Sequence, residues 1–322
     1  MGKYSICLDI GGTKVLGAVF NKDKKIIYRL KKKTKAQDGF LNVENSICSV
    51  VEELLEKSKI DLEEVDIISA GAPGVIDQKE GMILFSPNLP WENYPIRQKM
   101  QTYFKKPFFI GNDVNVGTFG EWKYGAAKGY SNVIGLFLGT GIGGGLILEN
   151  SLYTGNGHKA AELGHVVLNE EGPLCGCGQR GCLEAFSSKT GMAEYIRQQI
   201  KRGRETKMKE AVSKGIFKSK AMKEAYQEGD AVMVEAVNRA AHYLSVACGS
   251  FINIFSPEIV VLGGGVMEAM GDVFLDKILS EVDKYVMPSI RSSVKICKAA
   301  LDDDSILYGA LALAEAYKKE IK

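Results

Sequence analysis

The sequence predicts a mixed α/β fold in two related lobes that face each other. Short apolar strands alternate with stretches of helical spacing along the chain. A strand, a glycine-rich turn and a second strand follow one another twice, at residues 4–20 and 133–148. At 322 residues the chain also exceeds a typical single domain. We therefore expect a small lobe of residues 1–115 and 302–322, and a large lobe of residues 116–301.

The first lobe opens with strands and continues with a helix. In chain order we expect strands over 4–10, 15–20 and 26–30, a helix over 43–55 and a strand over 65–70. The helix has apolar residues at helical spacing, whereas the strand at 65–70 is continuously apolar, which is typical of a buried parallel strand. The Ala- and Leu-rich stretch 306–319 predicts a terminal helix that returns to pack on this lobe.

The second lobe begins with a similar hairpin. Strands are expected over 133–138, 146–148 and 259–262, with a helix over 233–248. The turn of the hairpin contains the pattern G-x-G-x-x-G from Gly139, which in a dinucleotide-binding fold is followed by a helix. Strand-like residues follow here instead, so an NAD-dependent enzyme is disfavoured.

Composition excludes several classes of protein. The chain is 45% hydrophobic and 25% charged with a net charge of +2, so no overall field favours nucleic acid or membrane as a partner. The basic stretch 201–223 lacks interleaved aromatic residues and is interpreted as a solvated helix pair. The longest apolar stretch, 244–267, is broken by Asn253, Pro257 and Glu258 and predicts no membrane span.

The histidines and cysteines outside the motifs below have ordinary interpretations. His242 is expected in the core of the helix over 233–248, and His158 in an exposed loop. Cys7, Cys48, Cys248 and Cys297 are predicted to be reduced residues in apolar surroundings. Together with the missing secretory leader, this cysteine usage predicts a cytoplasmic protein.

Four residues in the middle of the chain have the composition of a zinc site. His165, Cys175, Cys177 and Cys182 supply three thiolates and one imidazole within eighteen positions. Four protein ligands close a tetrahedral site, so we predict a structural Zn²⁺ ion rather than a catalytic one. The alternative is a chance cluster of buried cysteines. Three of the seven cysteines in one eight-residue, glycine-rich loop favour zinc.

Both glycine-rich turns are candidates for phosphate binding. Backbone N–H groups of Gly11 and Gly12 can approach phosphate oxygens closely, and Thr13 adds a hydroxyl group. Asp9 is placed to hold Mg²⁺ through water. The alternative is an ordinary hairpin turn, and the second turn, from Gly139, makes a pair of phosphate hairpins the better interpretation. The P-loop pattern does not occur.

Polar residues also follow the predicted strand that ends at residue 110. Active sites of open α/β sheets gather at such strand ends. Asp113 is the natural general base and Asn112 a hydrogen-bonding partner for a polar substrate, although a helix N-cap would explain the same residues. Asn88, in Pro-Asn-Leu-Pro-Trp, suits a polyol hydroxyl, with a simple turn as its alternative.

Seven motifs of this chain, taken in sequence order, resemble those of the ROK family (repressor, open reading frame, kinase), and most closely its bacterial glucokinase branch. They are Asp9-x-Gly-Gly-Thr-Lys, Gly71-Ala-Pro-Gly, Pro87-Asn-Leu, Asn112-Asp113, Gly139-Thr-Gly-x-Gly-Gly-Gly, Glu162-x-x-His165 and the Cys-Gly-Cys-Gly-x-x-Gly-Cys-x-Glu block. The resemblance runs over nearly the whole chain, and the cysteine block is its most specific part.

The resemblance implies a two-lobed actin/hexokinase-like (ribonuclease H-like) fold that binds ATP between its lobes. It implies Asp113 as the base that takes a proton from a sugar hydroxyl group. The sugar would be bound by Gly74, Asn88, Asn112, Asp113, Glu162, His165 and Glu184, with His165 also a zinc ligand. ATP and Mg²⁺ would be bound by Asp9, Gly11, Gly12, Thr13, Lys14, Gly139, Thr140, Gly141, Gly143, Gly264 and Gly265.

The implied activity is ATP-dependent phosphorylation of a hexose. Glucose is the first candidate for the substrate, with glucose 6-phosphate as the product. N-acetylhexosamine, fructose or mannose kinases of the same family, and a non-catalytic sugar sensor, are the alternatives. The family's repressors carry an N-terminal helix-turn-helix module, whereas the first strand here is expected from Tyr4. The family also implies a homodimer or homotetramer. Ala161 stands where the family usually has Gly, so the identity of the sugar is left open.

Overall fold

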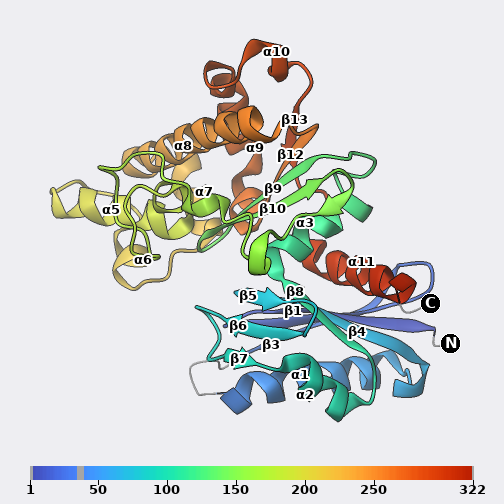
Figure 1. The fold of residues 1–322 in the computed structure, drawn as a ribbon. Coiled ribbons are helices and arrows are strands. Elements are labelled where there is room, and N and C mark those ends of the chain that lie inside the picture. Colours follow the sequence, from blue (N-terminus) through green and yellow to red (C-terminus); the bar gives the residue numbers. More distant parts are fainter. Residues whose placement is uncertain (1–2, 35–39, 321–322) are drawn as a thin grey trace. The chain divides into compact units, whose positions relative to one another are not determined.

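The structure is a computed structural model and describes residues 3–34 and 40–320 (Figure 1). Contacts divide the chain into two compact units. Unit 1 comprises Met1–Gly129, Leu152–Ala160 and Asp304–Lys322, and unit 2 comprises Tyr130–Ser151 and Ala161–Asp303. The predicted lobe boundary at residue 115 falls inside helix α3 (Asp113–Tyr124). The predicted lobe limits stay a prediction.

Unit 1 is built on a five-stranded sheet. The strands are β1 (Tyr4–Ile10), β2 (Lys14–Phe20), β3 (Ile26–Lys33), β4 (Val65–Ala72) and β8 (Phe108–Asn112), in the order β3-β2-β1-β4-β8. β1, β2 and β3 form an antiparallel meander, and β4 and β8 run parallel to β1. The predicted third strand and the predicted buried parallel strand are both confirmed.

Helices cover both faces of this sheet (Figure 1). Alternate residues of β1 face opposite sides. Ile6, Leu8 and Ile10 share a core with α1 (Phe40–Ser58) and α2 (Ile96–Phe104). Cys7 joins a second core with α3 and α11 (Ser305–Glu320). The terminal helix therefore returns to the first unit, as predicted.

Short elements complete unit 1. β5 (Val75–Asp77), β6 (Met82–Phe85) and β7 (Glu92–Tyr94) form a small antiparallel sheet. Three 3₁₀ turns are η2 (Leu62–Glu64), η3 (Asn156–His158) and, where the chain re-enters the unit, η6 (Asp302–Asp304). His158, predicted in an exposed loop, is partly exposed, and its Nε2 lies 3.6 Å from Oδ1 of Asp77.

Unit 2 repeats the sheet of unit 1. Its strands are β9 (Val133–Leu138), β10 (Ile142–Leu148), β11 (Ser151–Leu152), β12 (Ile259–Gly263) and β13 (Lys295–Lys298), in the order β11-β10-β9-β12-β13. β9 and β10 are antiparallel, whereas β12 runs parallel to both β9 and β13. This matches the order and directions in unit 1, which supports the predicted internal duplication. A strand, not a helix, follows the second glycine turn.

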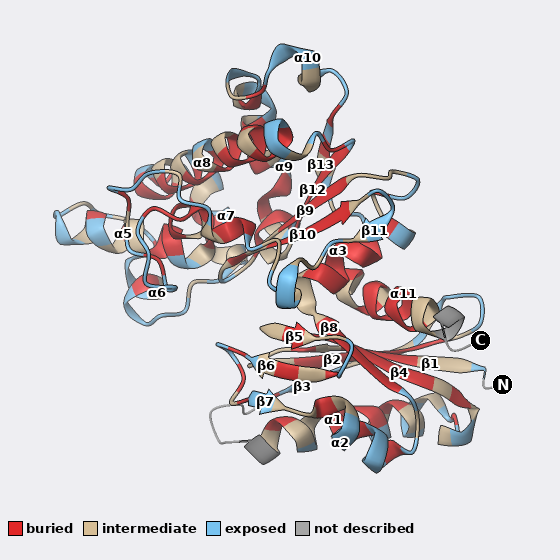
Figure 2. Ribbon diagram, in the orientation of Figure 1, coloured by how far each residue is buried: buried red, intermediate tan, exposed pale blue. Residues whose placement is uncertain are grey.

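Helices make up most of the rest of unit 2, and their buried faces form one large core (Figure 2). They are η4 (Leu163–His165), α4 (Leu183–Ser187), α5 (Lys189–Lys201), α6 (Lys209–Ser213), α7 (Ser219–Gln227), α8 (Ala231–Phe255), α9 (Gly265–Glu281), η5 (Val282–Lys284) and α10 (Pro288–Arg291). Helix α8 is longer than predicted at both ends. Asp230 caps its N-terminus, and a left-handed Ser256 ends it.

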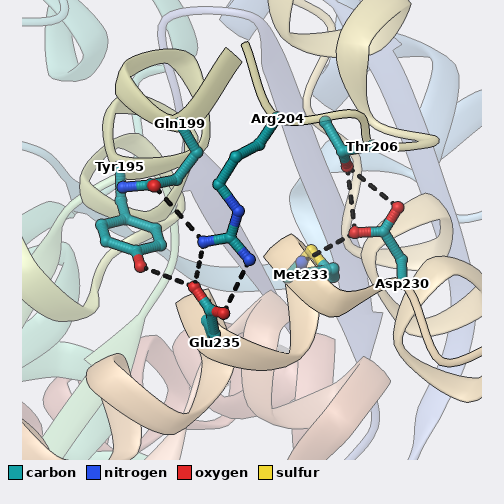
Figure 3. Close-up of polar contacts among 7 residues, drawn as sticks. All are labelled: Tyr195, Gln199, Arg204, Thr206, Asp230, Met233 and Glu235. Carbon is teal, nitrogen blue, oxygen red and sulfur yellow. Dashed lines mark hydrogen bonds and ion pairs between the residues drawn. The ribbon is translucent and has the colours of Figure 1, made fainter. Parts of the chain in front are cut away.

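The basic stretch 201–223 is tied into unit 2 by acidic partners (Figure 3). Arg204 donates two hydrogen bonds to the carboxylate of Glu235. Thr206 donates to the carboxylate of Asp230, which also accepts the N–H of Met233 at the start of α8. Arg204 and Thr206 thus tie this stretch to residues at the start of α8, consistent with a structural role for the stretch.

One prediction about a histidine is wrong. His242 was expected in the core, but nearly half of its side chain is exposed, and its Nδ1 lies 3.0 Å from Oε2 of Glu281. The helix over 233–248 exists, but His242 lies on its polar side, where a hydrogen bond with Glu281 takes the place of burial. Among the described residues, no helix has the length and apolar character needed to cross a membrane.

Candidate active site and metal centre

In unit 1, the predicted site residues gather where the parallel strands end. Asp9 on β1 is in register with Gly71 on β4, and Gly71 with Gly111 on β8. Asn112 and Asp113 follow directly. Because the carboxyl ends of parallel strands meet at one edge of the sheet, this edge gathers the first turn, the Gly71–Gly74 segment and the start of α3.

The first glycine turn is fixed by its neighbours. The N–H of Gly11 donates to the carbonyl of Lys14 (2.8 Å), and the hydroxyl of Thr34 donates to the carbonyl of Gly11 (2.8 Å). A Cβ atom on Gly12 would collide with the carbonyl oxygen of Asn88. The turn and the Asn88 loop, seventy-six residues apart in sequence, therefore touch through their backbones.

Asn112 is the N-cap of α3. Its Oδ1 accepts the N–H groups of Val114 (3.1 Å) and Asn115 (3.0 Å), and its Nδ2 donates to the carbonyl of Gly74 (3.0 Å). The capping alternative considered for this motif thus applies to Asn112. One N–H of the amide remains for a ligand.

Asp113 is the first residue of α3 and is partly exposed. Its Oδ1 accepts the N–H of Val114 at 2.9 Å. A carboxylate in the first turn of a helix is stabilised by the backbone dipoles there. The Asp113 carboxylate is therefore oriented by a hydrogen bond, is accessible to solvent and lies where β8 ends and α3 begins.

In unit 2, the second glycine turn is held by residues that follow the cysteine block. The N–H of Gly139 donates to the carbonyl of Gly141 (2.9 Å), and Oε2 of Glu184 accepts the N–H of Ile142 (2.9 Å). A Cβ atom on Gly141 would collide with the same Oε2. Gly264, between β12 and α9, lies against the backbone of Leu138, next to this turn. Glu162 is exposed.

The four predicted zinc ligands converge. The ligand atoms of His165, Cys175, Cys177 and Cys182 all lie within 4.8 Å of one another. Sγ of Cys175 is 3.7 Å from Nδ1 of His165, and Sγ of Cys177 is 3.7 Å from Sγ of Cys182. Ligands about 2.3 Å from a tetrahedral ion are separated by about this distance. The donor set and its spacing therefore fit zinc.

Burial and hydrogen bonding affect these thiols differently. Burial raises the pKa of the Cys175 thiol far above its ordinary value. At Cys177 burial acts the same way, but hydrogen bonds with the Gln179 backbone and the Cys175 and Cys182 thiols outweigh it and lower the pKa. A divalent cation among the four ligands would stabilise all three thiolates.

Two residues that support the turns had no distinguishing signal in the sequence. Thr34 binds the first turn, and Thr190 donates its hydroxyl to the carbonyl of Thr140 (2.8 Å) in the second. Each is a single threonine in a polar stretch, so only the fold identifies it. Unit 1 thus holds Asp9, the first turn, Gly74, Asn88, Asn112 and Asp113. Unit 2 holds the second turn, Glu162, Glu184, Gly264, Gly265 and the metal ligands.

Comparison with known proteins finds similarity to one family over nearly the whole chain. The model of the ROK family matches residues 5–317. A glucokinase of Thermotoga maritima is 35% identical over 310 residues, covering 96% of each chain. A glucokinase of Halalkalibacterium halodurans is 31% identical over 95% of this chain and 93% of its own.

Solved structures of sugar kinases of this family also resemble the structure. A ROK family glucokinase from Streptomyces griseus, solved in complex with glucose and AMPPNP, superposes with a TM-score of 0.83 at 30% identity, over 97% of this chain and 99% of its own. A ROK hexokinase from Thermus thermophilus superposes with a TM-score of 0.78 at 27% identity, over 98% and 99% of the two chains. The predicted actin/hexokinase-like fold is confirmed.

Proposed function

This chain belongs to the ROK family, and from that membership we propose that it is an ATP-dependent hexokinase whose preferred acceptor is glucose. The product is glucose 6-phosphate. The observation that carries the proposal in the structure is the carboxylate of Asp113 at the strand edge it shares with Asp9 and the first glycine turn. A phosphoryl-transfer enzyme needs this combination of a base and phosphate-binding backbone groups.

Asp113 accepts the proton of the attacking sugar hydroxyl group. Its Oδ1 bond to the Val114 N–H orients the carboxylate, and the Asn112 cap fixes the helix start on which it sits. Asn88, Gly74, Glu162, His165 and Glu184 bind the remaining sugar hydroxyl groups, and Asn112 contributes its remaining N–H. Positioning of this kind supplies much of the rate enhancement in phosphoryl transfer.

The two glycine turns bind the phosphates of ATP. Backbone N–H groups at Gly11–Lys14 and Gly139–Gly143 approach the phosphate oxygens, and Thr13 and Thr140 add hydroxyl groups. Asp9 would hold Mg²⁺, which would supply positive charge against the negative charge that develops on the transferred phosphoryl group. Gly264 and Gly265 lie along the adenosine.

The cysteine cluster has a structural role. His165, Cys175, Cys177 and Cys182 would hold zinc with no open position for substrate, so the ion would stabilise the loop between His165 and Cys182. Glu162 and Glu184 flank that loop in the sequence. We propose that the metal thereby fixes the sugar-binding carboxylates.

The test is a coupled ADP-release assay with Mg-ATP against glucose, mannose, fructose and N-acetylated hexosamines, with the zinc content measured on the same sample. Fast turnover of glucose is the expected result. A clear preference for an N-acetylated sugar would reassign the acceptor while keeping the reaction. No turnover of any sugar by zinc-loaded protein would contradict the enzyme and favour a non-catalytic sugar sensor.

We further propose a homodimer or homotetramer, which the resemblance to the family implies, located in the cytoplasm. The net charge of +2 favours neither nucleic acid nor membrane as a partner. Light scattering coupled to size-exclusion chromatography tests the assembly. A monomer of 35.1 kDa at assay concentration would contradict the proposed oligomer.

A further inference from the structure

The second glycine turn is held by the same segment that carries the metal ligands. Glu184 lies two residues after Cys182, and its two carboxylate oxygens contact different parts of unit 2. Oε2 accepts the Ile142 N–H at 2.9 Å, and Oε1 lies 3.3 Å from Sγ of Cys175. One side chain therefore bridges the metal cluster and the turn.

A second set of bonds comes from the start of α5, which follows α4 and Cys182 in the chain. The N–H of Lys189 donates to the carbonyl of Gly139 (3.1 Å). Thr190 donates to the carbonyl of Thr140 through both its hydroxyl (2.8 Å) and its N–H (3.3 Å). These bonds hold the turn's first two carbonyl groups.

The histidine ligand approaches the same strand from another segment. Gly164, next to His165, packs so closely on Ile142 that a Cβ atom on Gly164 would collide with the Ile142 carbonyl oxygen. Ile142 is thus contacted by Gly164 through its carbonyl and by Glu184 through its N–H. Both contacting residues lie within two positions of a metal ligand.

We propose that the metal centre positions the phosphate-binding turn at Gly139–Gly143, so that metal and nucleotide bind cooperatively. Glu184 and Thr190 are the positioning residues that transmit this coupling. The inference rests on the proposed function, in which that turn binds ATP. It adds a nucleotide-side role to a metal centre otherwise expected to serve the sugar.

The physical reason is conformational entropy. A turn with glycines at 139, 141, 143 and 144 has many accessible backbone states when its supports are loose. A metal that fixes the supports removes those states beforehand, so the nucleotide loses less freedom on binding. Linkage requires the reverse effect to be equal: nucleotide must strengthen metal retention by the same factor, typically about 5–150-fold.

The first experiment compares AMPPNP affinity, with Mg²⁺ and without hexose, in zinc-loaded protein and in protein stripped of zinc and returned to Mg²⁺ buffer. Titration calorimetry should give a dissociation constant at least about 5-fold weaker after stripping. In parallel, zinc transfer to a chromophoric chelator should be suppressed by AMPPNP. Neither readout depends on turnover.

Variants of Thr190 separate coupling from general loss of structure, because Thr190 contacts neither the metal ligands nor the proposed sugar ligands through its hydroxyl. Thr190→Val removes the hydroxyl bond to the Thr140 carbonyl and leaves the backbone N–H bond, and Thr190→Ser retains both as the matched control. We expect Thr190→Val, loaded with zinc, to bind AMPPNP about 2–5-fold more weakly and to show less protection of zinc by AMPPNP. Thr190→Ser should resemble the parent protein.

Glu184→Ala gives an independent result, because a residue that served only the sugar would not change AMPPNP affinity measured without hexose. We expect weaker AMPPNP binding, with Glu184→Gln, which keeps an acceptor oxygen, closer to the parent. Zinc content and thermal melting are measured on each variant.

The outcomes are distinct. Equal AMPPNP affinity with and without zinc, and no protection of zinc by AMPPNP, would overturn the coupling while leaving the kinase intact. No saturable AMPPNP binding to zinc-loaded protein would overturn both the coupling and the proposed function. If stripped protein loses its fold, the zinc-loaded Thr190→Val variant decides, and parent-like AMPPNP affinity there overturns the inference.

Discussion

Asn112 and Asp113 divide two tasks that a single aspartate would perform poorly. The amide of Asn112 accepts the N–H groups of Val114 and Asn115 and so caps α3. The cap therefore does not depend on Asp113. The carboxylate of Asp113 lies in the first turn of the helix and can serve as a base.

Replacing Asp113 with Asn tests that role. Asn is isosteric with Asp but is not a general base, so we expect kcat to fall by about 10²–10⁴-fold. Sugar affinity should change little, because Asn has nearly the same size and shape as Asp and can still form hydrogen bonds. Steady-state kinetics and hexose titration give the two quantities. Near-normal turnover would show that Asp113 is not the base.

Ala161 has a backbone conformation that favours glycine, the residue that the resemblance to the family implies at this position. Its φ of 67° lies in the left-handed region, which disfavours L-residues by about 1–2 kcal/mol. Its methyl group packs against the core of unit 2, which partly offsets this.

We therefore expect Ala161→Gly to leave the free energy of unfolding unchanged or to raise it by up to about 1 kcal/mol. Ala221 is the matched control, since it is also partly buried against the same core but lies in helix α7. Ala221→Gly should lower the free energy of unfolding by about 1 kcal/mol. Urea denaturation measures both, and equal losses would rule out strain at Ala161.

Among the elements, α8 shows how a long helix is anchored by one buried carboxylate. Asp230 accepts the N–H of Met233 (2.8 Å) and of Lys207 (2.7 Å) and two contacts from Thr206. Burial alone would raise its pKa, but these hydrogen bonds outweigh it and lower the pKa below the ordinary value. The cap therefore stabilises α8 in its ionised form.

Asp230→Ala should lower the free energy of unfolding at pH 7 by about 1 kcal/mol. Because the folded pKa is depressed, the stabilisation is fully present above the unfolded value of about 3.9 and disappears as pH falls through the folded value. The stabilities of parent and variant should therefore differ at pH 7, and the difference should shrink as the pH falls below about 4. A constant difference down to pH 3 would contradict the role of the charge.

At the scale of the whole molecule, each unit has its own sheet and its own core, and the metal ligands belong to unit 2 alone. Stability conferred by the metal should therefore be confined to that unit. Cys175→Ser or Cys177→Ser removes a thiolate and should release the ion.

Hydrogen exchange after metal removal should be faster in η4, α4 and β10, while the β1–β4 sheet of unit 1 keeps its protection. Cys248→Ser is the control, because this buried thiol in α8 is no metal ligand. Mass spectrometry of peptides from the two units makes the comparison. Equal loss of protection in both units would show that the metal stabilises the entire chain.

Much of this protein follows from local sequence. Apolar runs and helical spacing predicted most strands of the two five-stranded sheets and the helices α1, α8 and α11, because burial on one or two faces leaves a period in the sequence. Strand β13 was not predicted, and β10 begins at Ile142, inside the stretch expected to be a turn. The four metal ligands were predictable because zinc selects residue types that lie within eighteen positions of one another. The repeated glycine turns indicated the duplication for the same local reason.

Other features were decided only by tertiary structure. The close approach of Gly12 to the Asn88 backbone, the bond between Glu184 and Ile142 and the bond between Thr190 and Thr140 all join residues that are distant in sequence. The polar position of His242 was also missed, since its partner Glu281 lies on another helix. Sequence periodicity records which face of an element is buried. Which elements meet across that face, and at which residue, is set by packing of the complete unit.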